Sequence, residues 1–140
     1  MYPEAIVAPM RQECTSMGFS ELKSAAEVDQ QIKELKGTAL VFVNSVCGCA
    51  AGMARPGIKL ALTHAQAKPT KLFTVFAGND AEATAAVRRQ FVGYPPSSPS
   101  MGLMKDGHLV AMIQRSDIEG HSAQEVALQL LEVFNEHCQA

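Results

Sequence analysis

Residues 39 to 57, "ALVFVNSVCGCAAGMARPG", pass from an apolar run into a stretch compatible with a helix, and two cysteines lie at the junction. The run at 39–46 is rich in β-branched and aromatic residues with little alternation, which is typical of a strand buried on both faces of a sheet. We expect it to be the central strand. The following residues, 50–66, favour a helix that Pro56 would kink or interrupt near its first turns.

The neighbouring segments predict that helices and strands alternate. Residues 24–36 repeat apolar side chains at the spacing of one helical face, and Ser24 with Glu27 forms a capping box. Residues 71–77 predict a second buried strand, and 80–91 a helix.

The last third of the chain predicts a hairpin and a final helix. The apolar runs at 101–105 and 108–114 are joined by Asp106 and Gly107, which is a strong signal for a tight turn between antiparallel strands. The final segment, 122–138, has a second capping box and one apolar face.

Together these elements predict an α/β fold. A strand–helix–strand unit followed by a hairpin and a helix gives a central four-stranded mixed sheet with helices on both faces. The chain has 140 residues, 47% of them hydrophobic, which suits one domain with its own core. We expect a single domain over residues 1–140, with an N-terminal helical extension that includes a short helix at 10–17.

Charge and hydropathy exclude several classes of partner. The formal net charge is -2 and the charges are interspersed, so the sequence offers no basic face for nucleic acid and no polybasic membrane anchor. No apolar stretch approaches the length of a membrane span. The first residues, "MYPEAIVAPMRQE", are broken by Pro3 and Pro9 and lack the features of a secretory signal. We expect a cytoplasmic protein that binds neither nucleic acid nor membrane.

The four cysteines are therefore expected in a reducing compartment, where closely spaced thiols are more often metal ligands or redox groups than structural disulfides. Cys47 and Cys49 lie at a predicted helix start, where unpaired backbone N–H groups and the helix dipole stabilise a thiolate. Cys14 fits better as a small buried side chain. A structural zinc site needs a second pair of ligands that the sequence lacks, so we expect no metal ion.

Thiol–disulfide exchange is the chemistry that this pair fits best. It needs an attacking thiol and a second thiol that resolves the mixed disulfide, and Cys47 and Cys49 supply both. A disulfide across one residue closes a small, strained ring that is readily reduced. Such a pair suits accepting or reshuffling sulfur adducts. A disulfide isomerase, a general reductase and a non-catalytic metal-binding thiol module remain alternatives.

The order of elements, the cysteines after the central strand and "SSPSMGLMKDGHLV" at 97–110 resemble the thioredoxin fold, in which a cis-proline facing the active site precedes the last hairpin. Pro99 matches that proline, and we expect the Ser98–Pro99 bond to be cis. The segments "VNSVCGCAAGMARPG", "FAGNDAEATAAVR", "YPPSSPS" and "IEGHSAQEVALQLLEVFNEHC" resemble, more closely, the bacilliredoxin family of bacterial proteins with a Cys-Gly-Cys motif.

The resemblance implies a disulfide oxidoreductase that removes low-molecular-weight thiols, such as bacillithiol, from mixed disulfides on cytoplasmic client proteins. It implies that Cys47 is the nucleophile, Cys49 its partner and Cys138 a candidate third redox cysteine. Pro99 and Gly48 are expected to contact the substrate. No resident cofactor is expected, because the small thiol is a co-substrate and a separate reductase recycles the enzyme.

Two residues near the motif are open to more than one interpretation. Asn44 stands on the central strand where a thioredoxin would place an acid, so the proton acceptor is unassigned. Arg55 is either a solvated side chain or a positive charge that favours the thiolate.

Overall fold

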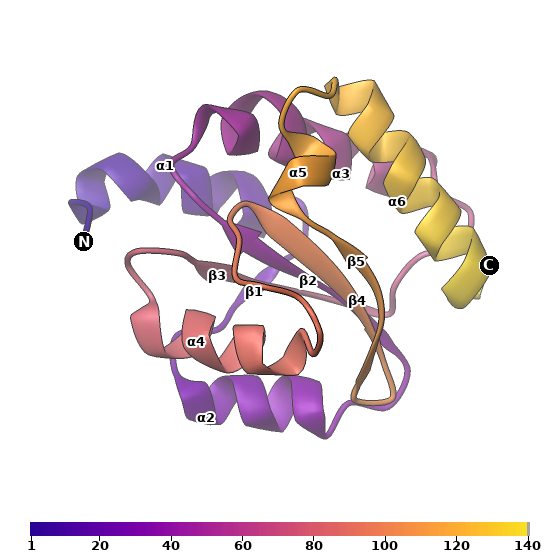
Figure 1. Ribbon diagram of the computed structural model, residues 1–140, viewed down its shortest axis with the longest axis horizontal. Coiled ribbons are helices and arrows are strands. Elements are labelled where there is room, and N and C mark those ends of the chain that lie inside the picture. The colour runs from indigo at the N-terminus through magenta and orange to yellow at the C-terminus, as the bar shows by residue number, and fades with distance from the viewer. Residues whose placement is uncertain (140) are drawn as a thin grey trace.

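The computed structural model describes residues 1–139, which form a five-stranded mixed sheet with helices on both faces (Figure 1). The strands are β1 (Ser20–Glu21), β2 (Thr38–Asn44), β3 (Lys71–Phe76), β4 (Ser100–Lys105) and β5 (His108–Ile113). Their spatial order is β1-β3-β2-β4-β5. β3 pairs in parallel with β1 and β2, and β4 is antiparallel to β2 and β5.

The sequence predicts the four longer strands and misses β1. β1 has two residues, which is too short for any hydrophobic alternation to be recognised in the sequence. It is a strand because Ser20 and Glu21 lie in register with Phe73 and Thr74 of β3. The predicted four-stranded sheet is therefore corrected to five strands, the fifth being a short edge strand.

The helices are α1 (Glu4–Thr15), α2 (Ala25–Val28), α3 (Arg55–His64), α4 (Ala81–Gln90), α5 (Arg115–Ile118) and α6 (Ala123–His137). α2 and α4 cover one face of the sheet, and α1, α3 and α6 cover the other (Figure 1). Within residues 1–139, no helix has both the length and the apolar character needed to cross a membrane.

β2 is the central strand, as predicted, and all seven of its residues are buried. Leu40 and Phe42 pack into the core beneath α3 and α6, whereas Val41 and Val43 pack into the core beneath α2 and α4. Side chains of a strand alternate between its two faces, so a continuous apolar run is what a strand between two helical layers requires.

α1 begins at Glu4 rather than near residue 10, and it contains Pro9. The sequence favours a later start because proline disrupts helix interiors. Tertiary contacts hold the first turns in place: Arg11 bonds to Glu4 and to Asp80, and the backbone N–H of Tyr2 donates to Asn79. Asp80 and Asn79 are distant from α1 in the sequence.

The predicted turn and the capping box at Ser122 are confirmed: Ser122 Oγ accepts a hydrogen bond from the amide of Glu125 at 3.1 Å, and the amide of Ser122 donates to the Glu125 carboxylate at 2.8 Å. Ser24 caps its helix by accepting from the amide of Glu27 at 3.1 Å, but the Glu27 carboxylate accepts from the amide of Lys23 instead of that of Ser24, so the predicted capping box there is incomplete. Asp106 and Gly107 have φ angles of 51° and 82°, the left-handed geometry that a tight hairpin turn needs at both central positions.

The helix expected at 50–66 has an irregular start. Ala50–Ala54 form a π-helical segment that leads into α3, and Pro56 lies in the first turn of α3. An interruption is expected there because proline lacks the N–H that a continuous helix would use. A second π-helical segment, Asp29–Lys33, continues α2.

Strand register decides which loops meet. Asn44 at the end of β2 lies opposite Phe76 at the end of β3, and Val43 lies opposite Ser100 at the start of β4. The loop with the two cysteines, the loop after β3 and the proline loop before β4 therefore lie at one edge of the sheet.

Candidate active site

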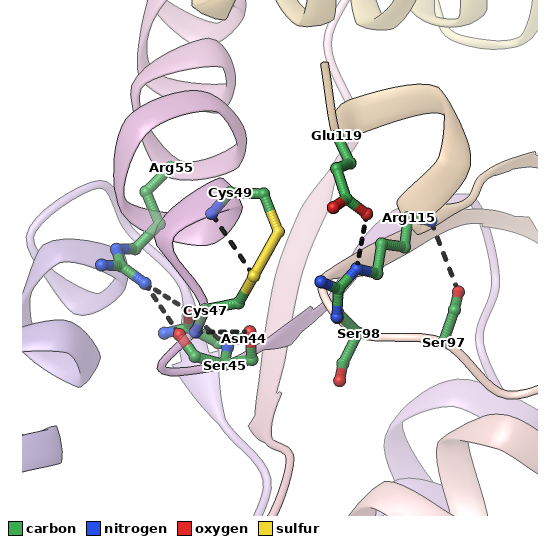
Figure 2. The surroundings of a disulfide bond; sticks show 9 residues. All are labelled: Asn44, Ser45, Cys47, Cys49, Arg55, Ser97, Ser98, Arg115 and Glu119. Atoms are coloured by element: carbon green, nitrogen blue, oxygen red, sulfur yellow. Dashed lines mark hydrogen bonds and ion pairs between the residues drawn. A yellow bond between two sulfur atoms is a disulfide. The ribbon is translucent and has the colours of Figure 1, made fainter. Parts of the chain in front are cut away.

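Cys47 and Cys49 form a disulfide at the carboxyl end of β2 (Figure 2), with their Cα atoms 5.3 Å apart. Cys47 is partly buried, Gly48 is exposed and Cys49 is only 6% exposed. Of the two sulfur-bearing residues, Cys47 is thus the one that solvent reaches more readily.

The first helical hydrogen bonds after the motif are accepted by the backbone of Cys47. Its carbonyl oxygen accepts hydrogen bonds from the amides of Ala50 and Ala51 at 3.0 and 3.2 Å. Its sulfur accepts one from the amide of Cys49 at 3.4 Å. Unpaired N–H groups and the positive end of the helix dipole favour negative charge at this position, so the site stabilises a Cys47 thiolate when the disulfide is reduced.

A series of hydrogen bonds holds the loop between β2 and Cys47 in place. Ser45 Oγ accepts from the amide of Cys47 at 3.2 Å, and Asn44 Oδ1 accepts from the amide of Ser45 at 2.9 Å. Arg55 Nη1 donates to Asn44 Oδ1 at 2.8 Å and to the carbonyl of Ser45 at 3.2 Å. The geometry of the loop is therefore fixed by hydrogen bonds.

The solvated interpretation of Arg55 is wrong. Arg55 is 4% exposed, pairs with Glu13 and turns its guanidinium toward Asn44 and Ser45 (Figure 2). Arg55 is buried because α3 packs this position against α1. The hydrophobic pattern of α3 alone does not predict that contact.

Asn44 and Cys14 continue this polar network into the core. The Asn44 amide nitrogen donates to the carbonyl of Met10 at 3.1 Å and to the sulfur of Cys14 at 3.5 Å. Cys14 is fully buried, and burial raises its pKa to about 12. It is the small buried side chain that the sequence predicts.

The Ser98–Pro99 bond is cis, as predicted, and lies at the same edge as the cysteines. Pro99 itself is buried, whereas Ser98 is partly exposed. Arg115 of α5 holds this loop: its backbone N–H donates to Ser97 Oγ at 3.4 Å, and its guanidinium donates to the carbonyl of Ser98 at 3.3 Å (Figure 2).

A groove of about 460 Å³ opens beside Cys47. It is lined by Tyr2, Ser45, Val46, Cys47, Ala77, Gly78, Arg88, Ser98 and Arg115. A larger cavity of about 520 Å³ runs along β1 and β3 and touches neither cysteine. We therefore regard the smaller groove as the candidate substrate site.

Gly48 leaves open space beside the pair, since a Cβ added there would meet nothing within 4 Å.

Cys138 is not part of this site. It follows α6, and its surroundings include Thr38 and Lys105 at the far end of β2 and β4. At about 3.3 Å per residue, the length of β2 separates the two ends by about 20 Å. Burial raises the pKa of Cys138.

Arg88 and Arg115 are functional candidates that the sequence does not indicate. They lie on α4 and α5, far from the cysteines along the chain, and no local motif distinguishes them from other surface arginines.

Throughout residues 1–139, no cluster of three or more His, Cys, Asp or Glu side chains could hold a metal ion.

Comparison with known proteins agrees with this geometry. The family described as disulphide isomerase matches residues 2–138. A bacilliredoxin of Koribacter versatilis is 51% identical over 140 residues, which are 100% of this chain and 96% of that protein. A bacilliredoxin of Geobacillus kaustophilus is 52% identical over 137 residues, covering 98% and 94% of the two chains.

Solved structures show the fold. Fasciola hepatica thioredoxin superimposes with a TM-score of 0.59 at 21% identity, covering 85% of this chain and 99% of that one. Thioredoxin O2 of Arabidopsis thaliana gives 0.58 at 17% identity, covering 89% and 97%. The predicted thioredoxin-like α/β fold is confirmed. Cys47 lies beside a groove at the end of the central strand and is joined to Cys49, and both bacilliredoxins share about half of their residues with this chain over nearly its whole length. The chain therefore belongs to the bacilliredoxin family and is a thiol–disulfide oxidoreductase.

Proposed function

We propose that this protein removes low-molecular-weight thiols of the bacillithiol type from mixed disulfides on client proteins. The observation that carries the proposal is the unequal position of the two cysteines: Cys47 borders the groove at a helix start, and Cys49 is buried behind it. One thiol can thus be reached by a bulky mixed disulfide, and the other only by Cys47.

The first step is an attack by the Cys47 thiolate on the sulfur of the small thiol. The disulfide between the small thiol and the client breaks, and a new disulfide joins the small thiol to Cys47. The client leaves as a thiolate and takes a proton from solvent. Ser98 at the groove and open space above Gly48 leave room for the client chain, and Pro99 shapes the loop.

The second step releases the small thiol. The Cys49 thiolate attacks the Cys47 sulfur, the small thiol leaves, and the Cys47–Cys49 disulfide seen here is formed. Alternatively, the thiolate of a second small-thiol molecule attacks the small-thiol sulfur of the adduct, which forms the disulfide of two small thiols and frees the Cys47 thiolate. A separate reductase then returns the pair to thiols, so the cycle needs no resident cofactor and fits a protein of the reducing cytoplasm.

Disulfide isomerisation is a second candidate function, because the matching family is described as disulphide isomerase. An isomerase also uses an accessible thiolate to form a mixed disulfide, but the client's own thiol then displaces Cys47. Cys138 lies about 20 Å away along β2, so it cannot take part in either cycle within one molecule without a rearrangement of the fold.

The test uses a client protein carrying a small thiol on one cysteine. Reduced wild-type protein should release the client thiol, and Cys47→Ala should not, as followed by intact mass. Recovery of activity from a scrambled disulfide substrate, without removal of small-thiol adducts, would favour the isomerase instead.

A further inference from the structure

Arg88 is an arginine beside the candidate active site for which residues 1–139 provide no ion-pair partner. It lies in the last turn of α4 and lines the groove next to Cys47. Its Nε is buried and has no hydrogen-bond partner among residues 1–139. A buried N–H group of a charged side chain costs free energy when it has no hydrogen-bond acceptor. An arginine in such a position therefore needs an explanation.

The two buried arginines, Arg11 and Arg55, show how a buried guanidinium is paired elsewhere in this protein. Arg11 pairs with Glu4, Glu21 and Asp80, and Arg55 pairs with Glu13. Arg88 forms no ion pair within the described part of the chain. Among residues 1–139, no carboxylate therefore lies within ion-pair distance of its guanidinium.

Arg115 adds a second positive charge to the same groove. Its Nε bonds to Glu119 at 3.0 Å, but that carboxylate is 60% exposed and does not line the groove. None of the nine lining residues is acidic. Two arginines and Cys47 thus line the groove, and no carboxylate residue lines it with them.

We propose that Arg88, with Arg115, binds a carboxylate of the small thiol while that thiol is transferred to Cys47. This proposal rests on the proposed function. Guanidinium groups bind carboxylates through paired N–H···O bonds, and these are stronger when partly shielded from water. The preferred small thiol is one with a free carboxylate that reaches the two arginines while its sulfur lies at Cys47, as free cysteine has. Arg88 and Arg115 then determine specificity and take no part in breaking bonds.

A matched pair of probes separates this role from a general effect on Cys47. N-acetylcysteine and N-acetylcysteamine differ only by a carboxylate, and each is joined by a disulfide to thiopyridine. The Cys47 thiolate attacks the sulfur of the small thiol, the adduct forms on Cys47, and thiopyridone leaves with a change in absorbance. Cys49→Ala is the background, so that the adduct stays on Cys47.

The rate constant for attack by the protein is measured for each probe and divided by the rate constant for attack by free mercaptoethanol on the same probe. This ratio corrects for differences in the intrinsic reactivity of the two probes. The Cys49→Ala protein should prefer the carboxylate probe by about tenfold or more. Arg88→Gln should remove most of this preference, Arg115→Gln part of it, and Arg88→Lys should retain some. Arg89→Gln is the matched control, because Arg89 is exposed, adjacent in sequence and outside the groove. Higher salt should weaken the preference.

Three outcomes overturn the proposal. Equal rates for the two probes show that no carboxylate is bound, while the proposed function stands. An equal slowing of both probes by Arg88→Gln, with the preference kept, shows that Arg88 acts on the thiolate or the fold. Failure of both probes to form an adduct on Cys47 removes the proposed function and this proposal with it.

Discussion

The amide nitrogen of Cys49 lies 3.4 Å from the sulfur of Cys47 and donates a hydrogen bond to it. The helix start is therefore already arranged to stabilise negative charge on Cys47, since an N–H group aimed at a thiolate interacts with it more strongly than with a thiol. Cys49 lies further into the same turn and is buried, so it lacks the equivalent position.

This relationship predicts that Cys47 is the more acidic and the more accessible thiol of the pair. Alkylation of the reduced protein at about pH 6, mapped by peptide mass, should label Cys47 first. Cys14 should be labelled last in the folded protein, because burial raises its pKa to about 12. Faster labelling of Cys49 than of Cys47 would contradict the assigned roles.

Arg55 is predicted to stabilise the fold through the loop that carries the cysteines. Arg55→Ala leaves the buried carbonyl of Ser45 without its guanidinium donor and should lower the free energy of unfolding by about 2–3 kcal/mol. Glu13→Gln should cost less than about 1 kcal/mol, because the Glu13 side chain is 55% exposed. Denaturant unfolding of the oxidised proteins measures both, and equal losses would show that the ion pair alone accounts for Arg55.

Gly48 and Gly57 should respond differently to alanine. A Cβ at Gly48 meets nothing within 4 Å, so Gly48→Ala should change stability by no more than about 0.5 kcal/mol. A Cβ at Gly57 would lie 2.7 Å from Cγ1 of Val126, so Gly57→Ala should cost about 1–3 kcal/mol by separating α3 from α6.

The double variant Gly57→Ala with Val126→Ala is the control. It should be less destabilised than the sum of the two single variants, because the shortened side chain relieves the clash. Additive losses in thermal or denaturant unfolding would show that α3 and α6 do not approach closely at this point.

The spacing of the pair predicts its redox potential. With one residue between the cysteines, the disulfide ring is small and more easily reduced than that of a C-x-x-C pair. Titration against a glutathione buffer should place the potential well above the roughly -270 mV of thioredoxin, at about -180 to -120 mV. Inserting one alanine after Gly48 should lower the potential. A value at or below that of thioredoxin would identify a general reductase.

The sequence predicts the parts of the fold that rest on local pattern. The signal lies within a few residues for the run at β2, the helix caps at Ser24 and Ser122 and the turn at Asp106. β1 and the early start of α1 depend on partners far along the chain, such as Phe73 for β1, so no window of sequence reveals them.

The same distinction holds for the candidate site. Cys47 and Cys49 are recognisable because they sit together where a strand ends and a helix starts. Arg88 and Arg115 enter the groove only because strand register brings the ends of β2 and β3 and the start of β4 to one edge of the sheet. Arg55 is buried because it packs against α1, and the sequence of α3 alone does not predict this contact.

Intact mass spectrometry of Cys47→Ala and Cys49→Ala, each mixed with a client protein that carries a small thiol, distinguishes the roles of the two cysteines. We expect Cys49→Ala to free the client once and to accumulate the small thiol on Cys47, because the buried Cys49 is needed only to release it. We expect Cys47→Ala to free no client. Transfer of the small thiol by Cys47→Ala, or a requirement for both cysteines in the first turnover, would contradict these roles.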